Sequence, residues 1–123
     1  MGKAIALVKC KSDNSIWIGR YNGVSDCVEV YFEPYSKNYD FWDLMDKIRN
    51  TKYPEPPYQE ESCEIYSDYG NGFWWEGTFD RNKRYVVKGG CLDSMAYEIY
   101  GYEPEIHHEV SEWAKSVLEE LRA

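Results

Sequence analysis

The sequence has no long apolar run. A helix needs about 20 consecutive and mostly apolar residues to span a bilayer, and no segment of this chain approaches that length. Near the N-terminus only Ala4 to Val8 is continuously apolar, which is too short for the core of a signal peptide. We therefore expect a cytoplasmic protein that does not bind membranes.

The motifs of common nucleotide-binding and hydrolytic sites are also missing. The chain contains no G-x-x-x-x-G-K-[ST], G-x-G-x-x-G, G-x-S-x-G or H-E-x-x-H pattern, which excludes the usual phosphate cradles, the nucleophile elbow and the zincin site. Its four cysteines, Cys10, Cys27, Cys63 and Cys91, form no C-x-x-C pair, so a zinc knuckle and a thioredoxin-type motif are excluded. We expect four reduced thiols, no metal, no cofactor and no enzymatic activity.

What the chain does have is negative charge and aromatic side chains. Its 123 residues, enough for one domain, carry a net charge of −8, and 17% of them are aromatic. The charge is concentrated in residues 91–123, where eight acidic residues stand against Lys115 and Arg122. An acidic chain repels the phosphate backbone, so direct nucleic-acid binding is not expected, whereas a basic protein surface is attracted.

The residue patterns predict an α+β fold in a single domain, residues 1–123. Alternating apolar residues and short turns predict an antiparallel sheet of about five to six strands. Helical periodicity predicts three helices, packed mainly on one face of the sheet. The expected strands are Ala4–Cys10, Ile16–Arg20, Cys27–Phe32, Ser62–Tyr66, Phe73–Phe79 and Arg84–Lys88. The expected helices run from a cap at Asn38 or Asp40 to about Asn50, from Leu92 to Tyr100, and from Pro104 to Arg122.

The richest group of metal-ligand residues lies at the start of the last predicted helix. Glu105 and His108 have the Glu-x-x-His spacing of di-iron carboxylate sites, but the chain has no second such pair. On a helix both side chains fall opposite the apolar stripe and face water. The pattern therefore favours a solvated acidic face over a metal centre.

Cys91 is the one candidate nucleophile. It follows Gly89-Gly90 at the predicted start of a helix, where the helix dipole lowers a thiol pKa. A small packing residue at a strand–helix junction explains the same position, and we favour that interpretation.

Two neighbouring tryptophans fall on opposite faces of one predicted strand. If Trp75 faces the core, Trp74 faces away from it. Trp74 then forms either an exposed platform with Tyr69 nearby, or a buried contact with Pro57 and Tyr58. The sequence leaves both arrangements open.

These features favour a protein-binding module over an enzyme. In size and acidity the chain resembles the small acidic phage and mobile-element inhibitors of host defence, including anti-CRISPR and antirestriction proteins. That resemblance implies a partner protein whose basic, nucleic-acid-binding surface the chain occupies. The residues expected to bind are a charged rim and two aromatic anchors: Glu105, Glu109, Glu112, Glu119, Glu120, Trp74 and Tyr69.

Two other hypotheses stay open. The first is a small-molecule site or a small enzyme that uses an aromatic pocket or Cys91. The second is an oligomerising subunit, if the last helix exposes Trp113 or Leu118. Either a monomer or a homodimer is compatible with the sequence.

Overall fold

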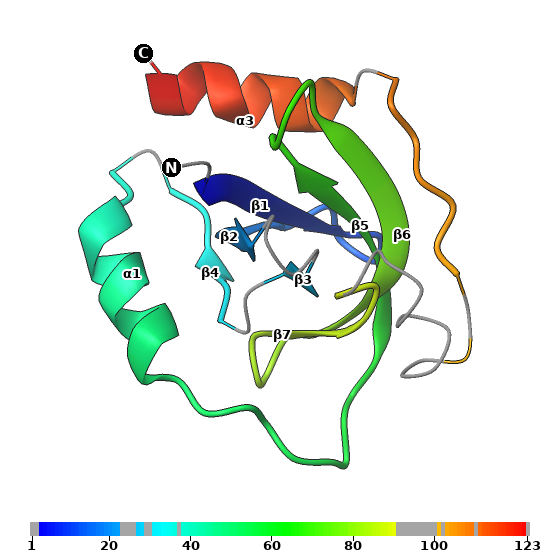
Figure 1. Cartoon of the computed structure of the whole chain (residues 1–123). Coiled ribbons are helices and arrows are strands. Elements are labelled where there is room, and N and C mark those ends of the chain that lie inside the picture. The colour runs from blue at the N-terminus through cyan, green and yellow to red at the C-terminus, as the bar shows by residue number, and fades with distance from the viewer. Residues whose placement is uncertain are drawn as a thin grey trace.

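The computed structural model describes residues 3–22, 27–28, 31–36, 38–90, 101, 103–109 and 111–122. This part of the chain contains seven strands and two helices (Figure 1). The strands are β1 Lys3–Cys10, β2 Ile16–Asn22, β3 Cys27–Val28, β4 Glu33–Pro34, β5 Glu61–Ser67, β6 Phe73–Asp80 and β7 Tyr85–Lys88. The helices are α1 Phe41–Asn50 and α3 Glu112–Arg122.

The strands form one antiparallel sheet. Six of them follow the order β3-β2-β1-β5-β6-β7, and β4 pairs with β2 beside β3. An antiparallel sheet combined with helices is confirmed. The sheet has seven strands rather than five or six because Pro34, expected to end the third strand, pairs with Trp17 as part of β4. Proline is tolerated there because β4 needs no backbone donor on its outer side.

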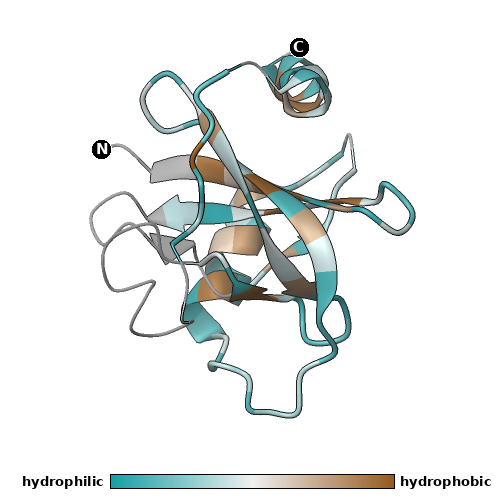
Figure 2. Cartoon of the chain, turned by 90° about the vertical axis from the view of Figure 1, so that its right-hand side faces the viewer, coloured by the Kyte–Doolittle hydropathy of each residue, from teal (hydrophilic) through white to brown (hydrophobic). Residues whose placement is uncertain are grey.

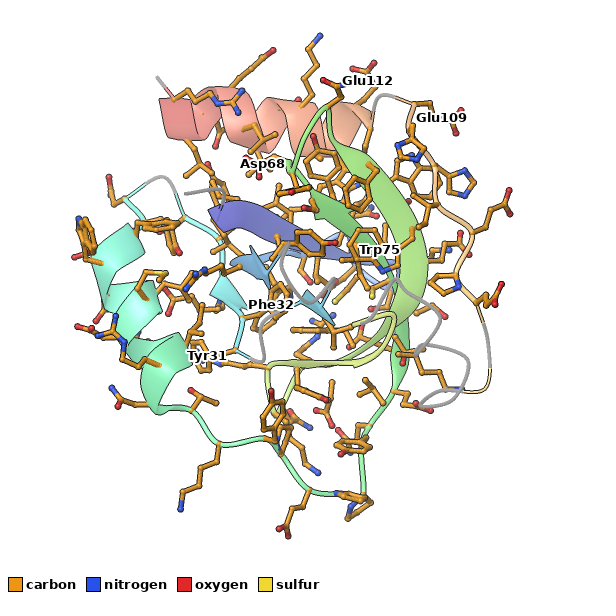
Figure 3. The ribbon with its side chains drawn as sticks, viewed as in Figure 1. Tyr31, Phe32, Asp68, Trp75, Glu109 and Glu112 are labelled. Atoms are coloured by element: carbon orange, nitrogen blue, oxygen red, sulfur yellow. The ribbon has the colours of Figure 1, made fainter. Side chains whose placement is uncertain are left out.

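The sheet curls until its ends meet. Phe32, just before β4, donates its backbone N–H to the carbonyl of Arg84, just before β7, over 3.0 Å. The inside of the curl is filled by a core that includes Trp75, Phe32 and Phe79, all fully buried. Figure 3 labels Trp75 and Phe32 in this core. Because successive side chains alternate across a strand, the residues between these inward positions point out of the curl.

The outer face of the sheet carries a second core under α3. Leu7 and Ile18 of the sheet pack against Ala114, Val117 and Leu118 of the helix. Figure 2 shows α3, next to the C-terminus, lying outside the curled sheet.

Helix α1 also reaches the outer face. Arg20 lies on the same side of β2 as Ile18, and its guanidinium contacts the thioether of Met45 in α1 over 3.7 Å. The described residues therefore contain two helices, not the predicted three, and both contact the outer face of the sheet. Neither helix of the described residues is long and apolar enough to cross a membrane.

The helix predictions have different outcomes. Helix α1 begins as predicted, because the Asp40 carboxylate accepts the backbone N–H groups of Trp42 and Asp43 at 3.0 and 3.1 Å. The predicted helix Pro104–Arg122 is wrong in its first part, since α3 begins only at Glu112. The predicted helix Leu92–Tyr100 lies outside the described residues.

Arg81, in the turn between β6 and β7, ties two other segments together. Its guanidinium lies 2.7 Å from Asp13, in the β1–β2 turn, and 2.9 Å from Glu61 at the start of β5. The hydrogen bonds to Arg81 hold the pKa of both carboxyl groups below the ordinary value. Carboxyl groups with a lowered pKa stabilise the fold above about pH 4, and that contribution is lost as the pH falls through the folded-state pKa.

We expect Arg81→Gln to remove part of this pH dependence. Urea unfolding between pH 7 and about pH 2.5 should show wild type losing stability more steeply on acidification than the variant. Lys52→Gln, which removes one positive charge from an exposed site, is the control and should keep the wild-type slope. Parallel curves for wild type and Arg81→Gln would contradict the role given to Arg81.

Candidate functional site

A strap of extended chain, Glu103–Glu109, runs alongside β6, on the side of Trp74 that does not pair with β5 (Figure 1). Trp74 and His107 exchange two backbone hydrogen bonds of 2.8 Å each and form an isolated antiparallel bridge. Their rings stack, with centroids 4.0 Å apart and planes 17° from parallel. The backbone groups of His107 that a helix would use are committed to Trp74 instead. This pairing is why the predicted helix does not begin at Pro104.

Two open depressions flank Trp74. One, of about 440 Å³, lies between Trp74 and the strap; its lining residues are Trp74, Glu76, Glu103, Pro104, Glu105 and His107. The other, of about 450 Å³, lies toward the start of α3; its lining residues are Lys9, Glu64, Trp74, Glu109, Ser111, Glu112 and Trp113. We give the name acidic–aromatic surface to the acidic and aromatic residues around Trp74 that line either depression. These residues are Trp74, His107, Glu64, Glu76, Glu103, Glu105, Glu109 and Glu112.

The sheet itself contributes two of these carboxylates. Glu64 of β5 lies directly opposite Glu76 of β6, an arrangement of like charges that destabilises a strand pair. Lys11 offsets it with an ion pair to Glu76 of 2.8 Å, and the indole N–H of Trp113 donates to Glu64 over 3.0 Å. Both carboxylates are therefore held in place by neighbours.

The strap and the start of α3 contribute glutamates that face solvent. Glu105, Glu109 and Glu112 are exposed, and Figure 3 shows the last two outside the sheet, near the start of α3. In the described part of the chain, none of the three forms an ion pair with a lysine or arginine. Glu109 lies 3.6 Å from Nδ1 of the His107 imidazole. The field of these carboxylates is thus directed outward.

The predicted binding residues divide into three groups. Trp74, Glu105, Glu109 and Glu112 come together on the acidic–aromatic surface. Further along α3, Glu119 lines a third depression, which Glu109 also lines, together with Lys115 and Arg122, and Glu120 accepts a hydrogen bond from the hydroxyl of Tyr35 over 2.7 Å. Tyr69 lies in the β5–β6 turn, 46% exposed, with its ring centroid 5.9 Å from that of Tyr21 in the enclosed core.

Both arrangements considered for Trp74 are wrong in detail. It is half-buried rather than an open platform, and its cover is His107 rather than the proline-rich segment. Tyr58 of that segment stacks on Tyr85 instead, with ring centroids 6.0 Å apart.

Sequence reasoning did not identify several residues of this surface. Glu64, Glu76 and Glu103 join it only through the register of β5 with β6 and the path of the strap. Strand alternation places Glu76 on the same face as Trp74, so that signal was present. The contact of His107 with Trp74 had no local signal.

The described thiols are poor candidates for chemistry. Cys10 and Cys63 are buried, unpaired and opposite each other on β1 and β5. Burial raises the pKa of both thiols above the ordinary value, so they stay protonated. Cys91 lies outside the described residues.

Among the described residues, no three His, Cys, Asp or Glu side chains are grouped to hold a metal ion. Glu105 and His108, proposed from their spacing, lie on the extended strap rather than on a helix. The helical spacing that relates them to di-iron sites therefore does not apply here.

Comparisons of the chain with protein-family models, curated proteins and solved structures return no significant match.

Proposed function

We propose that this chain is a small acidic protein-binding module whose acidic–aromatic surface occupies a basic, nucleic-acid-binding surface of a partner protein. The observation that carries the proposal is the set of exposed glutamates around Trp74: Glu105, Glu109 and Glu112 form no ion pair with a lysine or arginine of the described residues. On this proposal the carboxylates take the place of nucleic-acid phosphates. Inhibition of a host-defence protein, as small acidic phage and mobile-element inhibitors perform it, is the specific role we infer.

The electrostatics of the surface support a cationic partner. Unpaired carboxylates on one face steer a basic surface toward it and accelerate the encounter. Glu105 and Glu109 are exposed, so a partner's arginines can reach them without displacing a residue of this chain. Bidentate arginine–carboxylate pairs are the strong form of this contact.

The shape of the surface supports a macromolecule over a small ligand. A small-molecule site buries most of its ligand in a concave pocket. Trp75, the tryptophan that faces inward, is sealed in the core, whereas Trp74 lines two open depressions. Aromatic groups beside charges on an open surface are typical of protein interfaces.

The test is capture of a partner from nuclease-treated extracts of cells that encode the chain. Reversing Glu105, Glu109 and Glu112 to lysine changes the net charge from −8 to −2. We expect this variant to reduce capture of a nucleic-acid-binding protein at least about 100-fold, because attraction becomes repulsion. Quantitative mass spectrometry measures the capture, and the thermal midpoint reports whether the fold is retained.

A matched pair of variants separates the surface from overall charge. Glu105→Lys with Glu109→Lys, and Glu55→Lys with Glu60→Lys, each change the net charge by +4, but only the first pair lies on the acidic–aromatic surface. Neither pair alters Glu112, which supports the positive end of the α3 dipole. We expect only the first pair to lose capture. Equal loss in both pairs, or undiminished capture by the first, would refute the proposal.

A further inference from the structure

Two buried thiols lie directly opposite each other on the two middle strands of the sheet. Cys10 of β1 is the register partner of Cys63 of β5. Both side chains are fully buried in the enclosed core, and both are free thiols. A single buried cysteine is an ordinary small core residue. Two that face each other across one strand pair also have a chemistry in common, and neither belongs to the acidic–aromatic surface.

The hydrogen bonds between β1 and β5 show which kind of pair the two cysteines form. In an antiparallel ladder, pairs that exchange backbone hydrogen bonds alternate with pairs that do not. The backbone N–H of Lys11 donates to the carbonyl of Ser62 over 3.0 Å, and that of Asp68 donates to Ile5 over 3.2 Å. Both bonds join pairs whose β1 residue has an odd number. Cys10 has an even number, so its pair is one without hydrogen bonds.

This kind of pair suits a disulfide. Its Cα atoms lie about 4.5 Å apart, and its side chains approach more closely than those of a hydrogen-bonded pair. Disulfides join residues whose Cα atoms are about 4.4 to 6.8 Å apart. Cys10 and Cys63 also point to the same side of the sheet, because both lie in the core inside the curl. A bond between the two sulfur atoms therefore needs no change in the register of β1 with β5.

The surroundings of Cys63 agree with this geometry. On its other side, the residue opposite Cys63 is Gly77 of β6, which has no side chain to separate the two thiols. The pKa of the Cys63 thiol is raised mainly by burial and next by the nearby Cys10. The two sulfur atoms are thus close enough to influence each other.

We propose that Cys10 and Cys63 form a reversible disulfide that joins β1 to β5 under oxidising conditions. The oxidant is a small disulfide, for which oxidised glutathione is the probe. One protein thiolate attacks a sulfur of the oxidant, releases one glutathione and leaves a mixed disulfide. The second protein thiolate displaces the other glutathione and closes the bond. Two protein thiols are oxidised, and one glutathione disulfide is reduced to two thiols, which take up the two protons.

Burial determines when this exchange takes place. Only a thiolate attacks a disulfide, and burial raises the pKa of both thiols, so the folded chain reacts slowly. The exchange begins while the β1–β5 ladder is open, and formation of the ladder brings the two sulfur atoms together. The closed loop contains β2, β3, β4 and α1. Closing a long loop restricts the unfolded chain, so the disulfide stabilises the fold.

Refolding from urea in oxidised glutathione tests whether the disulfide forms. Cys27→Ala with Cys91→Ala leaves Cys10 and Cys63 as the only two cysteines of the chain. We expect at least about nine in ten molecules of this variant to contain the disulfide after refolding. Intact mass spectrometry after alkylation of free thiols measures that fraction. Peptide mapping of refolded wild type should identify the same Cys10–Cys63 pair among its four cysteines.

A second measurement shows whether the disulfide fits the folded chain. The oxidised form of Cys27→Ala with Cys91→Ala should unfold at a urea concentration at least about 1 M above that of its reduced form. The reduced form is the matched control because its sequence is identical. Without urea, its thiols should react with Ellman's reagent at least about 100-fold more slowly than in the unfolded chain.

Three results would overturn the proposal: refolded protein without the disulfide, wild-type Cys10 or Cys63 joined to Cys27 or Cys91 instead, or an oxidised form no more resistant to urea than the reduced one. The variant with Glu105→Lys and Glu109→Lys changes neither thiol and should form the disulfide like wild type. Failure of the disulfide and failure of partner capture are therefore distinguishable.

Discussion

Replacing Gly77 with alanine is expected to lower the free energy of unfolding by about 3 kcal/mol or more, at the upper end for overpacking. A Cβ atom at this position of β6 would lie 2.1 Å from the carbonyl oxygen of Lys88 and 2.9 Å from Cδ1 of Ile65. The closest atom belongs to the backbone of β7 and cannot rotate away. The clash can be relieved only if β7 moves away from β6. The pairing of these two strands helps to close the curled sheet. Urea denaturation measures the loss.

Two variants identify the cause of that loss. Adding Ile65→Val to Gly77→Ala removes the side-chain clash only, so it should not restore stability. Gly70→Ala meets no neighbouring atom, but it places a side chain at φ +64, so it should cost only about 1 kcal/mol. Rescue by Ile65→Val would show that the backbone contact does not limit the sheet.

Trp75→Ala is expected to cost about 3–5 kcal/mol. The side chain is fully buried, stacks on Phe73 with centroids 5.4 Å apart, and meets the edge of Tyr21 at 6.2 Å. Its indole N–H also donates to the carbonyl of Gly89 over 2.6 Å. The alanine variant therefore creates a large cavity and leaves a buried carbonyl without its donor.

Trp75→Phe separates these two effects. Phenylalanine keeps most of the ring volume and loses the donor, so about 1–3 kcal/mol should be lost. Trp113→Phe is the matched control, because it loses a donor to the half-buried Glu64 and should cost about 1 kcal/mol or less. If Trp75→Phe and Trp75→Ala were equally destabilising, the hydrogen bond rather than packing would dominate.

The sheet was predictable because its signal is local. In β6 the alternation of Trp74 and Glu76 with Phe73 and Trp75 assigns each side chain to a face without knowledge of the partner strand. The turns and the Asp40 cap are likewise encoded by neighbouring residues. Most strands and α1 therefore lie close to where the pattern placed them.

The strap was not predictable because its structure is decided by distant contacts. The apolar stripe of the last helix extends back to Ile106, so local periodicity favoured a helix from Pro104. Pairing of His107 with Trp74, 33 positions earlier in the chain, overrides that preference. The exposure of Trp42 also depends on how α1 is rotated against the sheet, which the pattern of Leu44, Met45 and Ile48 defined only on the buried side.

Distant contacts also decide whether the last helix can self-associate, and the sequence does not reveal them. Trp113 and Leu118 were candidates for self-association through α3. Leu118 is 6% exposed beneath the helix, and Trp113 is half-buried and bonded to Glu64. Leu118 is therefore not available to a second copy, and Trp113 is engaged by a contact within its own chain.

The most direct test of the acidic–aromatic surface is a ¹⁵N NMR titration of the wild-type chain with an arginine-rich peptide, compared with an uncharged peptide of equal length. We expect saturable shifts of the Trp74 indole N–H and of the strap amides, weakened by added salt and absent with the uncharged peptide. The Trp75 indole, sealed in the core, should not shift. Shifts spread evenly over the molecule, or centred on α1, would contradict a cationic-partner site at Trp74.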